Sequence, residues 1–171
     1  IHWPPEESDF DATLDRLMAE RDKGHARAIG VSNFSPAMMR RAQTRCGGAI
    51  VNNQVEFHPL LDQTKVLATA RELGIALSAY SPLARGAALK PAVIGAIAAR
   101  IGRPPSEVVL RWILQQGVIA IPMTTKRGNA MSNIAALGFT LSDEDMAAIS
   151  AIGTKNGRTI SPESMAGRWE P

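Results

Sequence analysis

The stretch that decides the fold runs from residue 26 to residue 56 and reads ARAIGVSNFSPAMMRRAQTRCGGAIVNNQVE. It opens on a short apolar run from Ala26 to Val31, which predicts a buried strand. Ser35-Pro36 predicts the start of a helix, because a hydroxyl can cap the first turn and proline fits its first position. We expect this helix to reach about Arg45 and a second strand to cover Ala49 to Glu56. Strand, helix and strand in this order form the unit of a parallel sheet.

The same alternation continues on both sides of this unit. Upstream, residues 1–5 read as the end of a strand, and apolar residues at helical spacing from Phe10 onward predict a helix that ends at Gly24. Downstream, the pattern predicts strands over residues 75–80 and 118–122. It predicts helices over residues 63–73, 91–100, 106–116, 129–137 and 142–152. The chain is therefore of the α/β class.

About five strands with their helices can be counted, and two architectures compete for them. A doubly wound fold would carry a GxGxxG phosphate turn, and the sequence contains none. A (β/α)8 TIM barrel needs about 250 residues, so these units fit its second half, from the end of strand 4 to the C-terminus. We expect residues 1–171 to be the C-terminal part of a single barrel domain, in a longer polypeptide, because half a barrel would leave open sheet edges. Residues 153–171 lack periodicity, and we expect them to lie as a tail over the barrel mouth.

Composition excludes several classes of function. The formal net charge is only +3 and aromatic residues make up 5%, so we expect no nucleic-acid partner. No apolar run has the length of a membrane span, and no cluster of His, Cys, Asp and Glu has metal-ligand spacing. Cys46 is the single cysteine, which rules out an intrachain disulfide and fits a reducing cytoplasm. We expect no membrane contact and no metal.

Polar residues follow the predicted strands at the end where barrels carry function. They are His2, Ser32-Asn33, residues 54–56, Tyr80-Ser81 and residues 122–127. This set has amide and hydroxyl groups and a basic end, so it suits a ligand that bears an amide and phosphates. We expect Glu56 to have a hydrogen-bonded role in the barrel and His58 to be structural.

The same segments resemble the motifs of the aldo-keto reductase family in order and spacing. The matching segments are residues 1–4 (IHWP), 30–34 (GVSNF), 53–59 (NQVEFHP), 79–83 (AYSPL), 110–112 (LRW) and 117–122 (GVIAIP). The resemblance covers essentially the whole chain. It implies a monomeric barrel enzyme that uses NADPH to reduce small aldehydes or ketones. Residues 124–129 and the tail from residue 156 resemble a branch of the family that reduces 2,5-diketo-D-gluconate.

The resemblance also implies roles for the residues of the first three motifs and for Tyr80. His2 would be catalytic, by hydrogen bonding to the substrate carbonyl, and Trp3 would line the substrate pocket unless it only packs. Ser32, Asn33 and Gln54 would hold the nicotinamide carboxamide, which needs both donors and acceptors. Tyr80 would stack on the nicotinamide ring.

At the other end of the cofactor, Ser81 and Leu83 would reach the pyrophosphate and Asn133 the adenine. The family commonly has a lysine and an arginine near the 2′-phosphate of NADP, and Met123 and Asn129 stand there in this chain. We expect Thr124, Lys126 and Arg127 to bind the 2′-phosphate instead, the alternative being that both cations are solvated loop charges.

No residue here matches the family's proton-donating tyrosine or the lysine and aspartate that assist it, because the family carries them before the first motif. A competing interpretation is therefore a nucleotide-binding barrel without turnover, acting as a sensor or subunit. Detecting those three residues upstream of Ile1 would favour the enzyme.

Overall fold

The computed structural model describes residues 1–165, 168 and 169. Its sheet has four parallel strands in the order β1-β2-β3-β4, which is also their order in the chain. The strands are β1 (Ile29–Ser32), β2 (Ile50–Glu56), β3 (Ala76–Tyr80) and β4 (Ile119–Ala120). β1 and β2 pair in parallel, so the segments that follow these two strands leave the same edge of the sheet.

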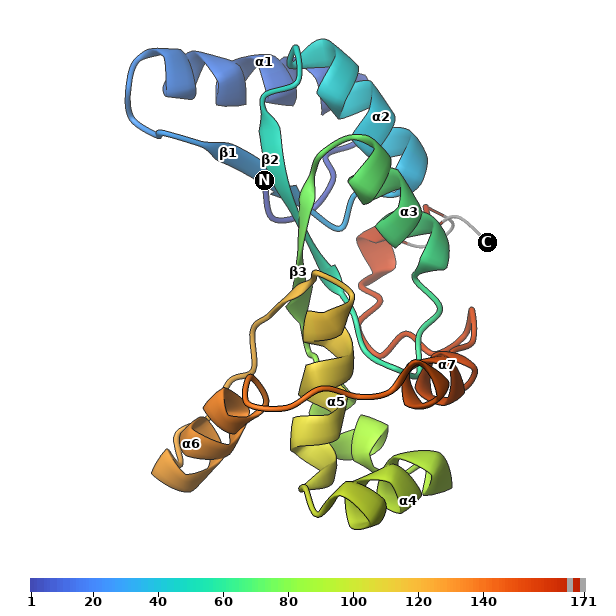
Figure 1. Ribbon diagram of the computed structural model, residues 1–171. Coiled ribbons are helices and arrows are strands. Elements are labelled where there is room, and N and C mark those ends of the chain that lie inside the picture. The colour runs from blue at the N-terminus through green and yellow to red at the C-terminus, as the bar shows by residue number, and fades with distance from the viewer. Residues whose placement is uncertain (166–167, 170–171) are drawn as a thin grey trace. The chain divides into compact units, whose positions relative to one another are not determined.

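Helices alternate with the strands as the sequence predicts (Figure 1). They are α1 (Phe10–Asp22), α2 (Pro36–Arg45), α3 (Thr64–Glu72), α4 (Ala92–Ile101), α5 (Pro105–Gln115), α6 (Arg127–Ala135) and α7 (Asp143–Ser150). The described residues also form three short 3-10 helices, which are η1 (Glu7–Asp9), η2 (Ala84–Leu89) and η3 (Glu163–Met165). None of the helices within the described residues has the length and apolar character that crossing a membrane requires.

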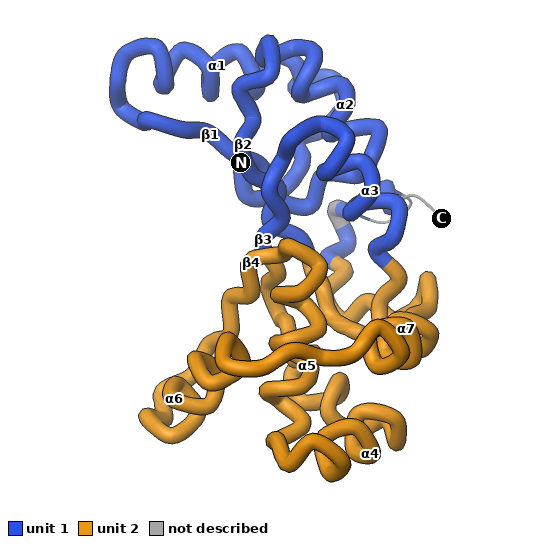
Figure 2. Tube along the Cα trace, in the orientation of Figure 1, with its two compact units in different colours: residues 1–55, 63–78, 162–171 blue, residues 56–62, 79–161 orange. Residues whose placement is uncertain are grey.

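Two compact units make up the chain (Figure 2). The first contains residues 1–55, 63–78 and 162–171, and the second contains residues 56–62 and 79–161. In the first unit, α2 contacts both α1 and α3, and the rings of Phe10 and Phe34 pack with centroids 5.3 Å apart. In the second, α5 contacts α4, α6 and β4. Trp112 of α5 packs against Phe57 and donates a hydrogen bond to Ser150 of α7 at 3.0 Å.

Gly30 sets the distance between β1 and β2. The register pairs Gly30 with Asn52 next to an irregularity after Ile29, and a Cβ on Gly30 would lie 2.9 Å from the Asn52 carbonyl oxygen. A side chain therefore could not be accommodated without moving the strand. The Asn52 amide in turn donates to Ser78 on β3 at 2.9 Å, which ties the next strand into the register.

The predicted start of α2 is confirmed. Ser35 accepts a hydrogen bond from the backbone N–H of Met38 at 3.4 Å and caps α2, as expected for Ser before Pro. Basic residues of α2 lie at the surface, where Arg45 pairs with Asp15 of α1 at 2.5 Å and Arg40 pairs with Glu72 of α3. Such exposed ion pairs are screened by solvent and salt, so they add little stability.

Two predictions of local structure are wrong, and one short helix was not predicted. Residues 1–6 carry no helix or strand, although the Ile1 amino group donates to the Gly30 carbonyl at 3.1 Å. The last strand covers only Ile119–Ala120, because Pro122 has no N–H to extend it, although Ile121 still donates to Ala79 at 3.0 Å. The helix η2 was not predicted, since its sequence has no helical periodicity.

Candidate functional site

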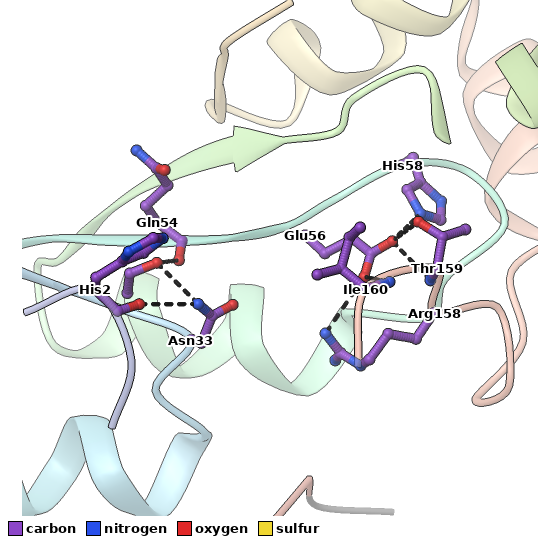
Figure 3. Close-up of polar contacts among 9 residues, drawn as sticks. His2, Asn33, Gln54, Glu56, His58, Arg158, Thr159 and Ile160 are labelled. Carbon is purple, nitrogen blue, oxygen red and sulfur yellow. Dashed lines mark hydrogen bonds and ion pairs between the residues drawn. The ribbon is translucent and has the colours of Figure 1, made fainter. Parts of the chain in front are cut away.

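Ser32 ends β1, and Asn33 begins the loop that follows it (Figure 3 shows Asn33). Both residues are buried, and Asn33 has a left-handed backbone with φ 63°. The Ser32 hydroxyl and the Asn33 N–H both donate to the Gln54 carbonyl, at 2.7 and 2.9 Å. The Asn33 side-chain amide donates to the Ser32 hydroxyl and to the His2 carbonyl, both at 3.1 Å. Asparagine tolerates a left-handed backbone, so its residue type fits this position.

Asn53 of β2 holds the same loop and was not assigned a role from the sequence. It is completely buried, its amide donates to the Phe34 carbonyl at 2.9 Å, and its side-chain oxygen accepts from the Phe34 N–H at 3.3 Å. The Asn53 side chain thus provides hydrogen-bond partners for both backbone groups of Phe34, in the loop that follows β1. The available signal was the residue type, since an amide at an inward-facing strand position needs hydrogen-bond partners.

Three other residues expected at the site, His2, Trp3 and Gln54, make different contacts around this loop. His2 is exposed, and its main-chain carbonyl, rather than its imidazole, accepts the bond from Asn33. Trp3 packs between His2 and Trp169, at ring-centroid distances of 5.8 and 6.4 Å. The Gln54 side chain extends away from Asn33, while its carbonyl faces the loop (Figure 3). The first unit therefore brings together Ser32, Asn33 and the backbone of His2 and Gln54.

A cavity of about 600 Å³ lies entirely within the second unit. Residues that follow β3, including Ser81 and Leu83, form part of its lining. Residues that follow β4, including Thr124 and Asn133, form another part. The other described lining residues are Pro82, Arg85, Gly86, Leu89, Ser106, Ile121, Pro122, Met123, Asn129 and Ser132. Four of the residues expected at the cofactor thus meet at one cavity, whose volume is typical of a ligand site.

Three other expected cofactor residues of the second unit lie outside that lining. Tyr80 is half-buried at the end of β3, and Lys126 and Arg127 are exposed at the start of α6. The Lys126 N–H donates to the Thr124 hydroxyl at 3.1 Å, which orders the turn before the helix. Arg85, to which the sequence assigned no role, lines the cavity instead. No local signal identifies Arg85, since its position depends on the backbone path through η2.

The Ser132 side chain is positioned by a buried carboxylate. Its hydroxyl donates to Glu107 of α5 at 2.8 Å, and Glu107 is only 5% exposed. Arg103 lies 3.5 Å from the other carboxylate oxygen and offsets its charge. One wall of the cavity is therefore fixed by a hydrogen-bonded chain that begins in the core of the unit.

Glu56 at the end of β2 forms a second buried cluster (Figure 3). Neither Glu56 nor His58 is exposed, and His58 Nε2 lies 2.9 Å from the carboxylate. The carboxylate also accepts from the Thr159 N–H at 2.8 Å, from the Thr159 hydroxyl, and from the Ile160 N–H at 3.1 Å. Arg158 lies 3.7 Å from it. Glu56 thus holds the segment that follows α7, which agrees with the expected hydrogen-bonded role.

The cluster keeps Glu56 ionised despite its burial. Burial alone would raise the pKa of this carboxyl, but the hydrogen bonds from His58, Thr159 and Ile160 outweigh burial and lower the pKa below its usual value. An ionised carboxylate only accepts, so His58 Nε2 carries the proton in this pair. Within the described residues His58 Nδ1 is buried without a hydrogen-bond partner, in keeping with a structural histidine.

The phenol of Tyr80 is kept protonated. Burial raises the pKa of Tyr80 to about 12, the charge of Glu56 adds to the rise, and Arg158 partly offsets it. A general acid works best with a pKa near the operating pH. Tyr80 is therefore unsuited to giving up a proton, whereas its ring remains suited to stacking. The described residues contain no group of three His, Cys, Asp or Glu side chains that could hold a metal ion.

Gly157 allows the tail to approach Leu60, in the segment that follows β2. Thr154 donates to Leu60 at 3.0 Å, and a Cβ on Gly157 would overlap the Leu60 carbonyl oxygen. We expect Gly157→Ala to lower the free energy of unfolding by about 1–3 kcal/mol, the usual cost of overpacking. Urea denaturation measures the change, and Gly128→Ala is the matched control, because nothing lies within 4 Å of a Cβ there. Equal stability of the two variants would contradict the close approach.

Comparison with known proteins identifies the family to which the chain is similar. Residues 1–154 match the profile described as the Aldo/keto reductase family. The methylglyoxal reductase DkgB of Escherichia coli O157:H7 is 39% identical, over 99% of this chain and 64% of that protein. The chain therefore spans less than two thirds of the length of this relative.

Solved structures of similar proteins support the same family and show the fold. A crystal structure described as a 2,5-diketo-D-gluconic acid reductase B has a TM-score of 0.94 and 37% identity, over 100% of this chain and 61% of that one. A mutant of Gox0644 in complex with NADPH has a TM-score of 0.87 and 34% identity, over 94% of this chain and 60% of that one. These likenesses confirm the predicted α/β class and (β/α)8 barrel fold.

Proposed function

The chain belongs to the aldo/keto reductase family, and on this premise we propose that the protein reduces small aldehydes or ketones to alcohols with NADPH. The observation that most supports the proposal is the cavity in which Ser81, Leu83, Thr124 and Asn133 meet. Its hydroxyl and amide groups can bind the ribose, phosphate and adenine of a dinucleotide. When bound, NADPH supplies the hydride that the carbonyl carbon accepts. Two similar proteins are named as a methylglyoxal reductase and as a 2,5-diketo-D-gluconic acid reductase B. We therefore propose a dicarbonyl compound as the substrate.

Residues of the first unit, together with Tyr80 of the second, are proposed to hold the reacting groups. Ser32, Asn33 and Gln54 bind the carboxamide of the nicotinamide, and Tyr80 stacks on its ring. The imidazole of His2 donates a hydrogen bond to the substrate carbonyl oxygen, with Trp3 lining the substrate pocket. A donor aimed at this oxygen stabilises the negative charge that grows on it during reduction.

Residues of the second unit are proposed to hold the rest of the cofactor. Ser81 and Leu83 bind the pyrophosphate and Asn133 binds the adenine end. Thr124, Lys126 and Arg127 bind the 2′-phosphate that distinguishes NADPH from NADH. We further propose that the chain is the C-terminal part of one barrel domain, and that the protein is a cytoplasmic monomer. The buried, unpaired thiol of Cys46, whose pKa is raised by burial, fits a reducing compartment.

Turnover and binding can be measured separately to test the function. NADPH oxidation by the purified full-length protein, including the part upstream of Ile1, is followed with methylglyoxal, 2,5-diketo-D-gluconate and a simple aldehyde, and NADPH binding is titrated without substrate. We expect binding and turnover with at least one carbonyl. Binding without turnover would support the alternative of a non-catalytic barrel, and neither binding nor turnover would refute the proposal.

The choice between NADPH and NADH is expected to depend on Lys126 and Arg127. Replacing both with alanine removes two cations from the start of α6, and we expect the Kd for NADPH to rise about tenfold or more, with little change for NADH. Calorimetric titration with both cofactors measures the ratio. Equal affinity of the unmodified protein for the two cofactors, or an indifferent double variant, would instead identify both residues as solvated loop charges.

A further inference from the structure

A cation that the sequence motifs do not identify lies at the cavity of the second unit. Arg85 is the one charged side chain among the described residues that line the cavity. It is exposed, and it makes no ion pair with the described part of the chain. A cation that faces a cavity lined otherwise by hydroxyl, amide and apolar groups is available to an anionic ligand.

The backbone around Arg85 fixes where its side chain begins. Ala84, Arg85 and Gly86 all have positive φ, at 46°, 53° and 93°. Ala84 and Ala88 are buried on either side, and Gly86 donates to the Leu83 carbonyl at 2.8 Å. Non-glycine residues keep such a conformation only where the surrounding structure determines it, and they cluster at ligand sites. Arg85 is therefore presented by an ordered turn.

We propose that Arg85 binds the pyrophosphate of the nicotinamide nucleotide, an inference that rests on the cofactor in the proposed function. Arg85 lies in η2, two residues beyond Leu83, within the segment after β3 that carries the groups proposed for the pyrophosphate. Thr124, Lys126 and Arg127, by contrast, follow β4. A guanidinium can bind two phosphate oxygens through parallel N–H groups, which neither Ser81 nor a leucine backbone can match in charge.

This assignment separates two electrostatic roles. The pyrophosphate is common to NADPH and NADH, so Arg85 contributes equally to both cofactors. The 2′-phosphate is present only in NADPH, so Lys126 and Arg127 contribute to discrimination. Arg85 thus supplies affinity, and the cations of α6 supply specificity.

Calorimetric titration of the purified protein with NADPH, NADH and ADP tests the assignment. We expect Arg85→Ala to raise the Kd of all three ligands about tenfold or more, with the NADPH to NADH ratio unchanged. Arg85→Asn is the second variant, because asparagine tolerates positive φ and keeps the turn intact. Lys90→Ala is the matched control, since Lys90 is exposed, adjoins η2 and does not line the cavity. This control should leave all three affinities unchanged.

Each outcome is informative. A loss confined to NADPH would overturn the proposal and move Arg85 to the 2′-phosphate. Unchanged affinities in both Arg85 variants, or an equal loss in Lys90→Ala, would overturn it as well. Absence of NADPH and NADH binding in the unmodified protein would refute the proposed function, which distinguishes that failure from a wrong role for Arg85.

Discussion

Replacing Glu56 with alanine is expected to lower the free energy of unfolding by about 3–5 kcal/mol, the usual cost of removing one partner from a buried charged cluster. The loss leaves His58, Arg158 and two backbone N–H groups of the tail without their acceptor. In a chain of this size each 1 kcal/mol lowers Tm by about 2–4 °C, so thermal denaturation will detect it. Glu163→Ala, at an exposed glutamate, is the control and should leave Tm unchanged.

Comparison with Glu56→Gln measures how the stabilisation by the Glu56 carboxylate depends on pH. The pKa of Glu56 is lowered in the folded state, so the stability from its ionised form is fully present above the usual value of 4.5 and is lost as the pH falls through the folded pKa. The difference in unfolding free energy between the unmodified protein and Glu56→Gln should therefore be constant near neutrality and shrink below about pH 4.5. A difference independent of pH would show that the carboxylate charge is not what holds the tail.

In the complete enzyme, His2→Ala is expected to lower kcat for carbonyl reduction by a factor of about 10²–10³, with the Kd for NADPH nearly unchanged. Removing one donor that stabilises developing negative charge typically costs about 2.7–4 kcal/mol of the barrier. The His2 ring is exposed, and its residue contacts the Asn33 loop through its main chain, so the substitution spares the loop. Steady-state kinetics and cofactor titration measure the two effects independently.

Two further variants sharpen this test. His25→Ala changes an exposed histidine that pairs with Glu20, and it should behave like the unmodified protein. His2→Gln keeps a side-chain donor and should recover part of the lost rate. Normal turnover in His2→Ala, or a loss of NADPH affinity alone, would show that His2 does not face the substrate oxygen.

The sequence predicted features that depend on neighbouring residues. Ser35 caps α2 because its partner, Met38, lies three residues away, and Ser142 caps α7 in the same way through Asp145 at 3.2 Å. The order of strands and helices followed from apolar spacing, and the fold class followed from that order. These signals depend only on residues close together in the sequence, so they can be recognised without the structure.

Features that depend on distant segments were not predictable in the same way. The sequence could mark Glu56 as a carboxylate at a strand end, but its donors come from residues 158–160. From the sequence, Lys126 and Arg127 were the expected cations of the cofactor site. In the structure Arg85 lines the cavity, and it lies in a turn whose residues have positive φ. A turn built on Ala84 and Arg85 has no recognisable composition, because these residue types rarely adopt it.

The bonds between Glu56 and the tail also determine an order of events during synthesis. Glu56 and Thr159 are separated by 103 residues, so at about 5–20 residues per second the donors emerge about 5–20 s after the carboxylate. Until then Glu56 remains hydrated, and closing so long a loop carries an entropic cost that local contacts do not. Docking of residues 158–160 is therefore a late step of folding, and it removes water from the carboxylate only once its donors have been translated.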